Sequence, residues 1–252
     1  MPPLSLHTSF ARRIAERLQA TVLDDERGNL YLGATAPDIR VITRWERSRT
    51  HFFDLENFEH QDAVSDFFGA HPALADAAGV SPPTCAFIAG YVSHLVMDAT
   101  WIDRIYRPFF GRDSQLGGSL RANILDRALQ YSLDCDTRCD DELMADIVDS
   151  VARVDLKLEI DFIDRDTLHQ WRGIIADFAK TQPDWDRYRE RIRRHLTDNG
   201  EGAGDDPEEL ALALPDLVDE TLRHLSRQRL EAWMNETLDE SVAAVREYLR
   251  CA

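Results

Sequence analysis

Lysine is nearly absent from this 252-residue chain, in which Lys157 and Lys180 are the only lysines among 29 basic residues. Asp and Glu together number 46, so the formal net charge is -17 and the isoelectric point is about 4.8. A surface of this sign repels nucleic-acid phosphates and anionic lipid head groups, which argues against a general nucleic-acid or membrane-surface binder. Only a local positive patch would attract an anion.

Cysteine is scarce as well, with four in the chain. Cys135 and Cys139 are four residues apart, which is not the C-x-x-C spacing of a zinc knuckle or a redox site. We interpret all four cysteines, including Cys85 and Cys251, as free thiols of a reducing compartment. The first seven residues, MPPLSLH, have neither the basic nor the apolar region of a signal peptide. These features predict a cytoplasmic protein.

The chain also lacks the motifs of common nucleotide and acyl-transfer sites, because no glycine-rich phosphate loop and no G-x-S-x-G motif occurs in it. Apolar and polar residues alternate over no more than about five residues, so no sheet is predicted. Helical periodicity predicts an all-α fold instead. Helices are expected at about 8–20, 60–77, 119–133, 140–157, 166–180, 184–196, 208–225 and 227–249, with an irregular segment at 24–50 and a flexible acidic loop at 198–209.

One apolar run, CAFIAGYVSHLVMDATWI at residues 85–102, is about as long as a minimal membrane-spanning helix. It contains His94 and Asp98, and an Asp at the centre of a bilayer costs roughly 2.5 to 3.5 kcal/mol. No second run of this kind follows it in the sequence. We therefore interpret the run as the central buried helix of a soluble all-α domain, in which both polar residues must find partners.

His94 and Asp98 lie four residues apart, so their side chains share one face of this helix. A neutral imidazole and a carboxylate together are natural ligands for Zn²⁺, Mn²⁺, Fe or Ni²⁺, and the alternative interpretation is a buried hydrogen-bonded pair. Further donors occur nearer the N-terminus: Asp38 ends the stretch GATAPD, His51 lies in THF, and His7 begins the first helical stretch.

Taken in order, H…LGATAPD…THF…AGYVSHLVMD resembles the zinc-dependent phospholipase C and S1/P1 nuclease superfamily over about residues 5–135. The resemblance implies an all-helical metal-binding core. We therefore expect a phospholipase C/P1 nuclease-like core with additional C-terminal helices. The whole chain, 1–252, is expected to form a single all-α domain, with a metal-binding core in residues 1–135 and a C-terminal helical half in residues 136–252.

Carried over by motif, the resemblance implies one zinc site formed by Asp38, His51, His94 and Asp98, in which Asp98 is able to bridge two ions. It assigns His7 to a site that family members complete with their N-terminal amine and a leading Trp, where this chain begins Met-Pro. We expect one zinc ion, and more ions or another divalent transition metal remain alternatives. Asp38 is also the candidate catalytic base, provided that it is not used as a ligand.

The family's second metal site is where this sequence departs from the pattern. The family has a His six residues beyond the Asp of H-x-x-x-D, and here Arg104 holds that position; on a later helix, Asp126 and Gln130 replace a His and a carboxylate. We expect that this second ion is lost and that an ion pair between Arg104 and Asp126 replaces it. The alternative is an altered metal site that uses Asp126 with Asp103.

Local positive charge lies close to the predicted zinc ligands, because Arg40, Arg44, Arg47 and Arg49 face a single Glu within residues 40–51. These arginines either clamp a phosphate or carboxylate or pair with the acidic surface. The aromatic stretch after the buried helix, residues 106–110, either lines the mouth of a pocket or belongs to the core.

The sequence thus predicts a metal-dependent hydrolase that acts on a phosphate ester, in the manner of a phospholipase C or phosphodiesterase. Its partner is expected to be a small anionic, phosphate-containing substrate, without general nucleic-acid binding and without a transmembrane segment. The alternative is a non-hydrolytic family member whose metal site is structural or binds a small anion. A different enzyme chemistry at a single metal is a third hypothesis.

Overall fold

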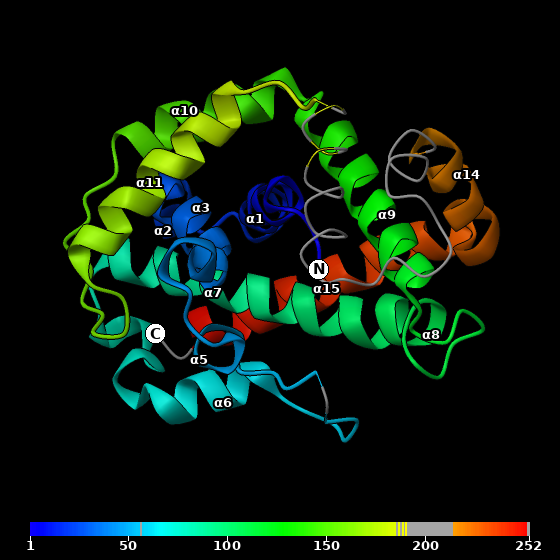
Figure 1. Cartoon of the computed structure of the whole chain (residues 1–252). Coiled ribbons are helices and arrows are strands. Elements are labelled where there is room, and N and C mark those ends of the chain that lie inside the picture. Colours follow the sequence, from blue (N-terminus) through cyan, green and yellow to red (C-terminus); the bar gives the residue numbers. More distant parts are fainter. Residues whose placement is uncertain (56, 185, 187, 189, 191–213, 251–252) are drawn as a thin grey trace.

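The computed structural model describes residues 1–55, 57–184, 186, 188, 190 and 214–250 (Figure 1). Every regular element within these residues is a helix, so the predicted all-α fold is confirmed. The α-helices are α1 (Leu4–Leu18), α2 (Thr21–Asp25), α3 (Arg27–Thr35), α4 (Arg40–Thr43), α5 (Arg47–His51), α6 (Ala63–Ala70), α7 (Pro82–Trp101), α8 (Arg107–Phe109), α9 (Leu120–Arg138), α10 (Asp141–Ala152), α11 (Arg165–Lys180), α14 (Leu214–Leu225) and α15 (Arg227–Arg250). Shorter turns are the 3-10 segments Ala36–Ile39, Pro72–Leu74 and Ala77–Gly79 and the π-helical segment Ile102–Tyr106.

Helix α7 crosses the middle of the molecule and packs most extensively against α3 and α15 (Figure 1). Pro82 and Pro83 occupy its first turn, where a missing N–H is tolerated. By length and composition alone, Pro82–Phe109 is apolar enough to cross a membrane, but 89% of its most apolar window is buried inside the protein. The apolar run therefore forms the buried central helix that the sequence predicts.

Two glycines bring the backbones of α3 and α7 into direct contact. A Cβ atom at Gly33 would lie 1.9 Å from the Phe87 carbonyl oxygen, and one at Gly90 would lie 2.2 Å from the Leu30 carbonyl oxygen. Because no side chain fits at either position, the two helices approach more closely than alanine would allow. This crossing sets the residues that follow α3 beside the middle of α7.

The expectation of an irregular segment at 24–50 is wrong for residues 27–35, which form helix α3. Gly28 lies inside this helix and allows close packing against α10. A Cβ atom there would lie 2.3 Å from the Ser150 carbonyl oxygen. After α3 the chain turns through Ala36–Ile39 into the short helices α4 and α5, and Arg44 ends α4 with a φ of 60°.

The other predicted helices lie close to the observed ones, with one clear exception. The helix expected at 60–77 ends at Ala70, because Pro72 follows and the chain continues in 3-10 turns. The helix expected at 184–196 and the acidic loop at 198–209 fall almost wholly outside the described residues. A continuous cluster of buried apolar side chains runs from Leu6 to Tyr248, and the division of the chain near residue 135 stays a prediction.

Candidate metal centre

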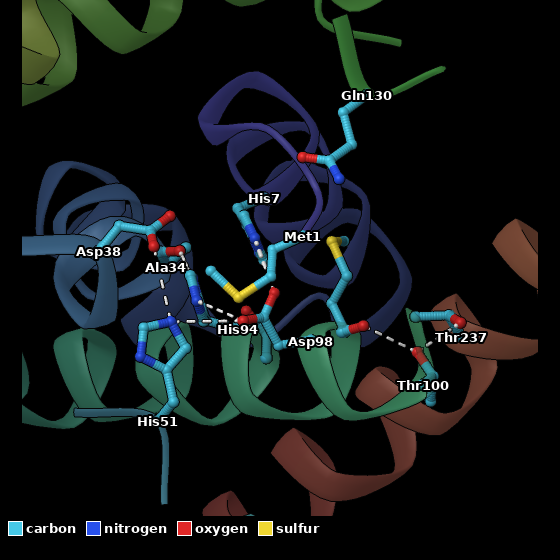
Figure 2. A network of polar contacts seen from close by, with 12 residues as sticks. Met1, His7, Ala34, Asp38, His51, His94, Asp98, Thr100, Gln130 and Thr237 are labelled. Atoms are coloured by element: carbon cyan, nitrogen blue, oxygen red, sulfur yellow. Dashed lines mark hydrogen bonds and ion pairs between the residues drawn. The ribbon is translucent and has the colours of Figure 1, made fainter. Parts of the chain in front are cut away.

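Five polar side chains converge above the middle of α7 (Figure 2). His94 and Asp98 belong to α7 itself, His7 comes from α1, Asp38 from the 3-10 turn after α3, and His51 from the end of α5. The three histidines are at most 1% exposed and Asp98 is 2% exposed. The structure thus brings together the five residues that the motifs singled out, although His7 and Asp98 are far apart in the chain.

Neighbouring polar groups determine which nitrogen of two imidazoles faces the cluster. His94 Nδ1 lies 2.8 Å from the Ala34 carbonyl oxygen, so this nitrogen carries the proton and donates. His51 Nδ1 lies 2.8 Å from the Thr50 hydroxyl, which itself donates to the Arg47 carbonyl oxygen at 3.4 Å. Both arrangements leave the lone pair on Nε2, which is the form of the ring that binds a metal.

The inward-facing atoms are spaced like the ligands of one ion. His51 Nε2 lies 3.3 Å from Asp98 Oδ2 and 3.5 Å from Asp38 Oδ1. His94 Nε2 lies 3.6 Å from Asp98 Oδ2. Zinc–ligand bonds of about 2.0 to 2.1 Å at tetrahedral angles place neighbouring donor atoms roughly 3.3 Å apart. These three distances are therefore close to the spacing of ligands on one zinc ion.

His7 approaches the other oxygen of the Asp98 carboxylate, with 3.6 Å between His7 Nε2 and Asp98 Oδ1. Its ring stacks on that of His94, with the ring centroids 3.8 Å apart. The ligand atoms of His7, His94 and Asp98 all lie within 4.8 Å of one another, as do those of Asp38, His51 and His94. Asp98 presents one oxygen to each side, which suits the bridging role that the resemblance implies.

Four of the inward-facing atoms have no hydrogen-bond partner among the described residues. This holds for Nε2 of His7, His51 and His94 and for Asp98 Oδ1, all of which are buried. Buried polar atoms are almost always paired, so several unpaired ones at a single point mark the place of a ligand. A divalent cation satisfies imidazole nitrogens and carboxylate oxygens together.

Burial and mutual contacts set the protonation of the cluster. Burial lowers the pKa of His7 to about 4 and also lowers the pKa of His51, so both rings are held in the neutral form. Burial opposes the charged form of His94 too, but the adjacent Asp98 carboxylate outweighs it and raises the His94 pKa. Burial also acts against ionised Asp38, yet the neighbouring imidazoles of His51 and His94 lower its pKa to about 2. A cation binds neutral imidazoles and ionised carboxylates, so His94 would release a proton when a metal ion binds.

Arg47 is the cation bonded to Asp98. Its Nη2 donates to Asp98 Oδ2 at 2.9 Å, and its Nη1 contacts the Met1 sulfur. Arg47 Nε is buried and has no hydrogen-bond partner within the described part of the chain. The nearby Arg49 behaves differently, because its guanidinium lies over the Trp45 ring, 3.7 Å from the centroid. The sequence showed an arginine cluster but gave no signal that Arg47 would be the member to reach the site.

The expected ion pair between Arg104 and Asp126 does not form. Arg104 instead binds Glu236 at 3.4 Å and Glu240 at 2.7 Å, both on α15. A helical residue six positions after Asp98 points about 120° away from it, so Arg104 faces α15 and not the metal centre.

The altered site with Asp103 is not formed either. Asp126 Oδ2 accepts a hydrogen bond from Gln130 Nε2 at 2.6 Å, and Asp103 pairs with Arg107 at 2.7 Å. Gln130 stands apart from the histidine cluster in Figure 2. Neither Asp103 nor Asp126 belongs to a group of potential ligands with metal-binding spacing among the described residues.

A cavity of about 930 Å³ opens beside the metal centre, one helical turn further along the α7 face. Ile102, Tyr106 and Arg47 line it, and its volume lies within the usual range for small-molecule sites. Residues 106–110 were predicted either to line a pocket mouth or to belong to the core, and both occur. Tyr106 and Arg107 line the cavity, whereas Phe110 is completely buried in the core.

Comparison with known proteins agrees with this site. Residues 6–112 match the family model described as zinc dependent phospholipase C, and this segment contains all five residues of the metal cluster. No curated protein and no solved structure matches the chain significantly. The matched segment ends before Asp126 and Gln130, the two positions that the resemblance assigns to the family's second metal site. Residues 6–112 are therefore similar to the zinc-dependent phospholipase C family.

Proposed function

We propose that this protein hydrolyses a phosphate ester with the help of one zinc ion held by Asp38, His51, His94 and Asp98. Similarity to this family supports a metal-dependent phosphoester hydrolase in general terms. The observation that carries the proposal is the pair of buried Nε2 atoms of His51 and His94, which lack hydrogen-bond partners among the described residues and lie 3.3 to 3.6 Å from carboxylate oxygens of Asp38 and Asp98. Zinc, when bound, supplies Lewis acidity that stabilises charge on a phosphoryl oxygen and acidifies water enough for attack at neutral pH.

Arg47 is the side chain best placed to bind the reacting phosphate. It lines the cavity and also bonds Asp98, so its guanidinium stands between the predicted zinc ligands and the space open to a substrate. A guanidinium binds phosphoryl oxygens through paired N–H groups, and its fixed charge offsets the negative charge that develops during hydrolysis. Arg47 is therefore proposed to contribute both to substrate binding and to rate.

Asp38 is proposed as a ligand in preference to a base. Its Oδ1 lies 3.5 Å from His51 Nε2, close to the spacing of two ligands on one ion. The neighbouring imidazoles of His51 and His94 outweigh burial and hold the Asp38 pKa at about 2, and so acidic a carboxyl group is a weak proton acceptor at neutral pH. The role of Asp38 as catalytic base stays a prediction.

The proposed substrate is a small anionic phosphate ester, and the proposed location is the cytoplasm. The arginines around the cavity support an anionic ligand. The cysteines that the structure describes, Cys85, Cys135 and Cys139, are free thiols, which supports a reducing compartment.

A non-hydrolytic role is the second candidate, and the second-site residues favour it. Asp126 and Gln130 bond to each other, and Arg104 faces α15, so the described residues form no second ligand group at the family's second position. In that case the single zinc ion would have a structural role or would bind a small anion without turnover.

Zinc content and hydrolysis of bis(p-nitrophenyl) phosphate test the proposal. Protein purified without chelators should contain about one zinc ion per chain and release p-nitrophenol in a zinc-dependent manner. His51→Ala should lose both properties, whereas His169→Ala, which removes an exposed histidine of α11, should keep both. Bound zinc without hydrolysis of diester or monoester would favour the non-hydrolytic role. Equal zinc in His51→Ala and the parent protein would contradict the site.

A further inference from the structure

The cavity beside the metal centre is positively charged on a protein whose net charge is -17. Five arginines line it, against two aspartates. The arginines are Arg40, Arg47, Arg107, Arg112 and Arg127, and the aspartates are Asp113 and Asp126. A concave surface lined by one sign of charge concentrates the field and attracts ligands of the opposite sign. The cavity therefore favours anions that the rest of the surface repels.

Two of these arginines are engaged within the protein, since Arg47 bonds Asp98 at 2.9 Å and Arg107 pairs with Asp103 at 2.7 Å. The remaining three form no ion pair with any carboxylate that the structure describes, and we call them the arginine subsite. Its members are Arg40, Arg112 and Arg127. An arginine that faces a cavity without a carboxylate partner keeps donors available for an anionic ligand.

The bonds that these arginines do make are to neutral oxygens. Arg40 Nε donates to the Trp45 carbonyl oxygen at 3.3 Å, and Arg127 Nη1 donates to Gln130 Oε1 at 3.3 Å. Such bonds orient a guanidinium but leave its charge uncompensated. Arg40 and Arg127 are thus oriented at the cavity wall without a carboxylate partner.

The rim of the same cavity is apolar. Leu55 and Phe58 line it with 43% and 60% of their surface exposed, and Val41, adjacent to Arg40, is 63% exposed. The Arg107 guanidinium lies 4.8 Å from the centroid of the Phe58 ring and holds this side chain beside the charged wall. Exposed apolar side chains next to uncompensated cations fit a ligand with both an apolar and an anionic part.

We propose that the arginine subsite binds a second anionic group, a phosphate or a carboxylate, of an amphiphilic substrate whose ester phosphate lies at the metal centre. This inference rests on the proposed function, to which it adds a second anion and an apolar part. The ester phosphate lies with Arg47, and the apolar part lies against Leu55 and Phe58. A single phosphate at the metal centre would leave three cations of the cavity without a counter-charge.

Binding to metal-free protein tests the subsite without relying on hydrolysis. Octyl phosphate carries an anion and an apolar chain, whereas inorganic phosphate carries the anion alone. In calorimetric titrations of protein stripped of metal and dialysed free of chelator, octyl phosphate should bind at least about tenfold more tightly than inorganic phosphate. Raising the salt concentration should weaken both, because the wall is charged.

Variants locate the binding on the cavity wall. Arg112→Gln/Arg127→Gln should weaken octyl phosphate binding by about tenfold or more, since two charge-assisted contacts are lost. The matched double variant Arg153→Gln/Arg165→Gln changes the net charge equally at two exposed arginines that do not line the cavity, and it should bind like the parent protein. The same difference between the two double variants is expected for zinc-loaded protein, in which the metal keeps the fold intact.

The rim and the source of the anion are tested separately. Leu55→Ser/Phe58→Ser should lose the preference for octyl phosphate over inorganic phosphate. If the protein sediments with phosphatidylglycerol vesicles but not with phosphatidylcholine vesicles, and if Arg112→Gln/Arg127→Gln abolishes this sedimentation, the anion belongs to a lipid surface. Octyl phosphate binding without vesicle binding would assign the anion to a soluble ligand. Absent octyl phosphate binding, or equal binding in Arg112→Gln/Arg127→Gln, would overturn the subsite. Intact binding in a protein that holds no zinc and hydrolyses nothing would retain the subsite and overturn the proposed function.

Discussion

The metal centre and the neighbouring stretch of α9 differ in how far their buried polar atoms are paired. At the centre, the Nε2 atoms of the histidines have no hydrogen-bond partner among the described residues. On α9, Gln130 donates to Asp126 Oδ2 at 2.6 Å, while Asp126 Oδ1 lacks such a partner. Buried polar atoms without partners are stable only beside a ligand, and several of them meet at the metal centre. We therefore expect a metal ion among the histidines and none between Gln130 and Asp126.

The largest expected effect comes from removing one histidine of the metal centre. His94→Ala deletes a ligand atom whose ring is oriented by the Ala34 carbonyl oxygen, and it should reduce bound zinc from about one ion per chain to less than about a tenth. Gln130→Ala deletes a side chain of similar burial on α9 and should leave the zinc content unchanged. Elemental analysis compares the two variants. Equal zinc loss in both would remove the distinction between the two regions.

The second effect concerns the helix crossing that builds the metal centre. Gly90→Ala would place a Cβ atom 2.2 Å from the Leu30 carbonyl oxygen, so α3 and α7 would have to move apart, at a cost of roughly 1 to 3 kcal/mol. Gly173→Ala is the matched control, because a Cβ atom there meets nothing within 4 Å, and helix propensity favours the change by about 0.5 to 1 kcal/mol. Denaturant unfolding measures both. Equal stability of the two variants would mean that the crossing tolerates a side chain.

The third effect is the loss of stability when zinc is removed. Because the proposed zinc ion would satisfy buried atoms of three elements, chelation should lower the free energy of unfolding by about 1 to 2 kcal/mol and the melting temperature by several degrees. Added zinc should restore the melting temperature, and His94→Ala should show no response to chelator. An unchanged melting temperature after complete metal removal would mean that protein hydrogen bonds satisfy the cluster.

Local spacing explains why much of this site could be predicted from the sequence. His94 and Asp98 share a helix face by their separation of four residues, and period and composition alone predict the buried helix that carries them. The glycines of the same motifs permit the close helix crossing that sets Asp38 beside this helix. Spacing was therefore enough to pair His94 with Asp98, and the resemblance to a known family was needed to add His7, Asp38 and His51.

Contacts between distant segments could not be predicted in this way. The partner of Arg104 lies on α15, more than a hundred residues later, and no local pattern directs the side chain toward Glu236 or Glu240. Arg112 and Arg127 belong to no motif, and they line the same cavity where α9 meets the segment after α7, with Tyr106 donating to Asn123 at 3.2 Å. Helix α3 was missed because its glycines resemble turn residues in sequence and serve packing in the fold.

The smallest expected effect concerns Arg104, and it tests whether the buried Asp126 of α9 depends on this arginine. The Arg104 side chain is 33% exposed, and its partners Glu236 and Glu240 are 48% and 45% exposed. Ion pairs in such surroundings contribute only about 0 to 1 kcal/mol, whereas breaking an ion pair with a buried carboxylate costs roughly 3 to 5 kcal/mol. Arg104→Ala should therefore lower the free energy of unfolding by at most about 1 kcal/mol and leave the zinc content unchanged. Glu240→Gln should act equally weakly. A loss of 3 kcal/mol or more in Arg104→Ala alone would mean that Arg104 forms an ion pair with the buried Asp126. In that case the ion pair, and not the bond between Gln130 and Asp126, would have replaced the second metal.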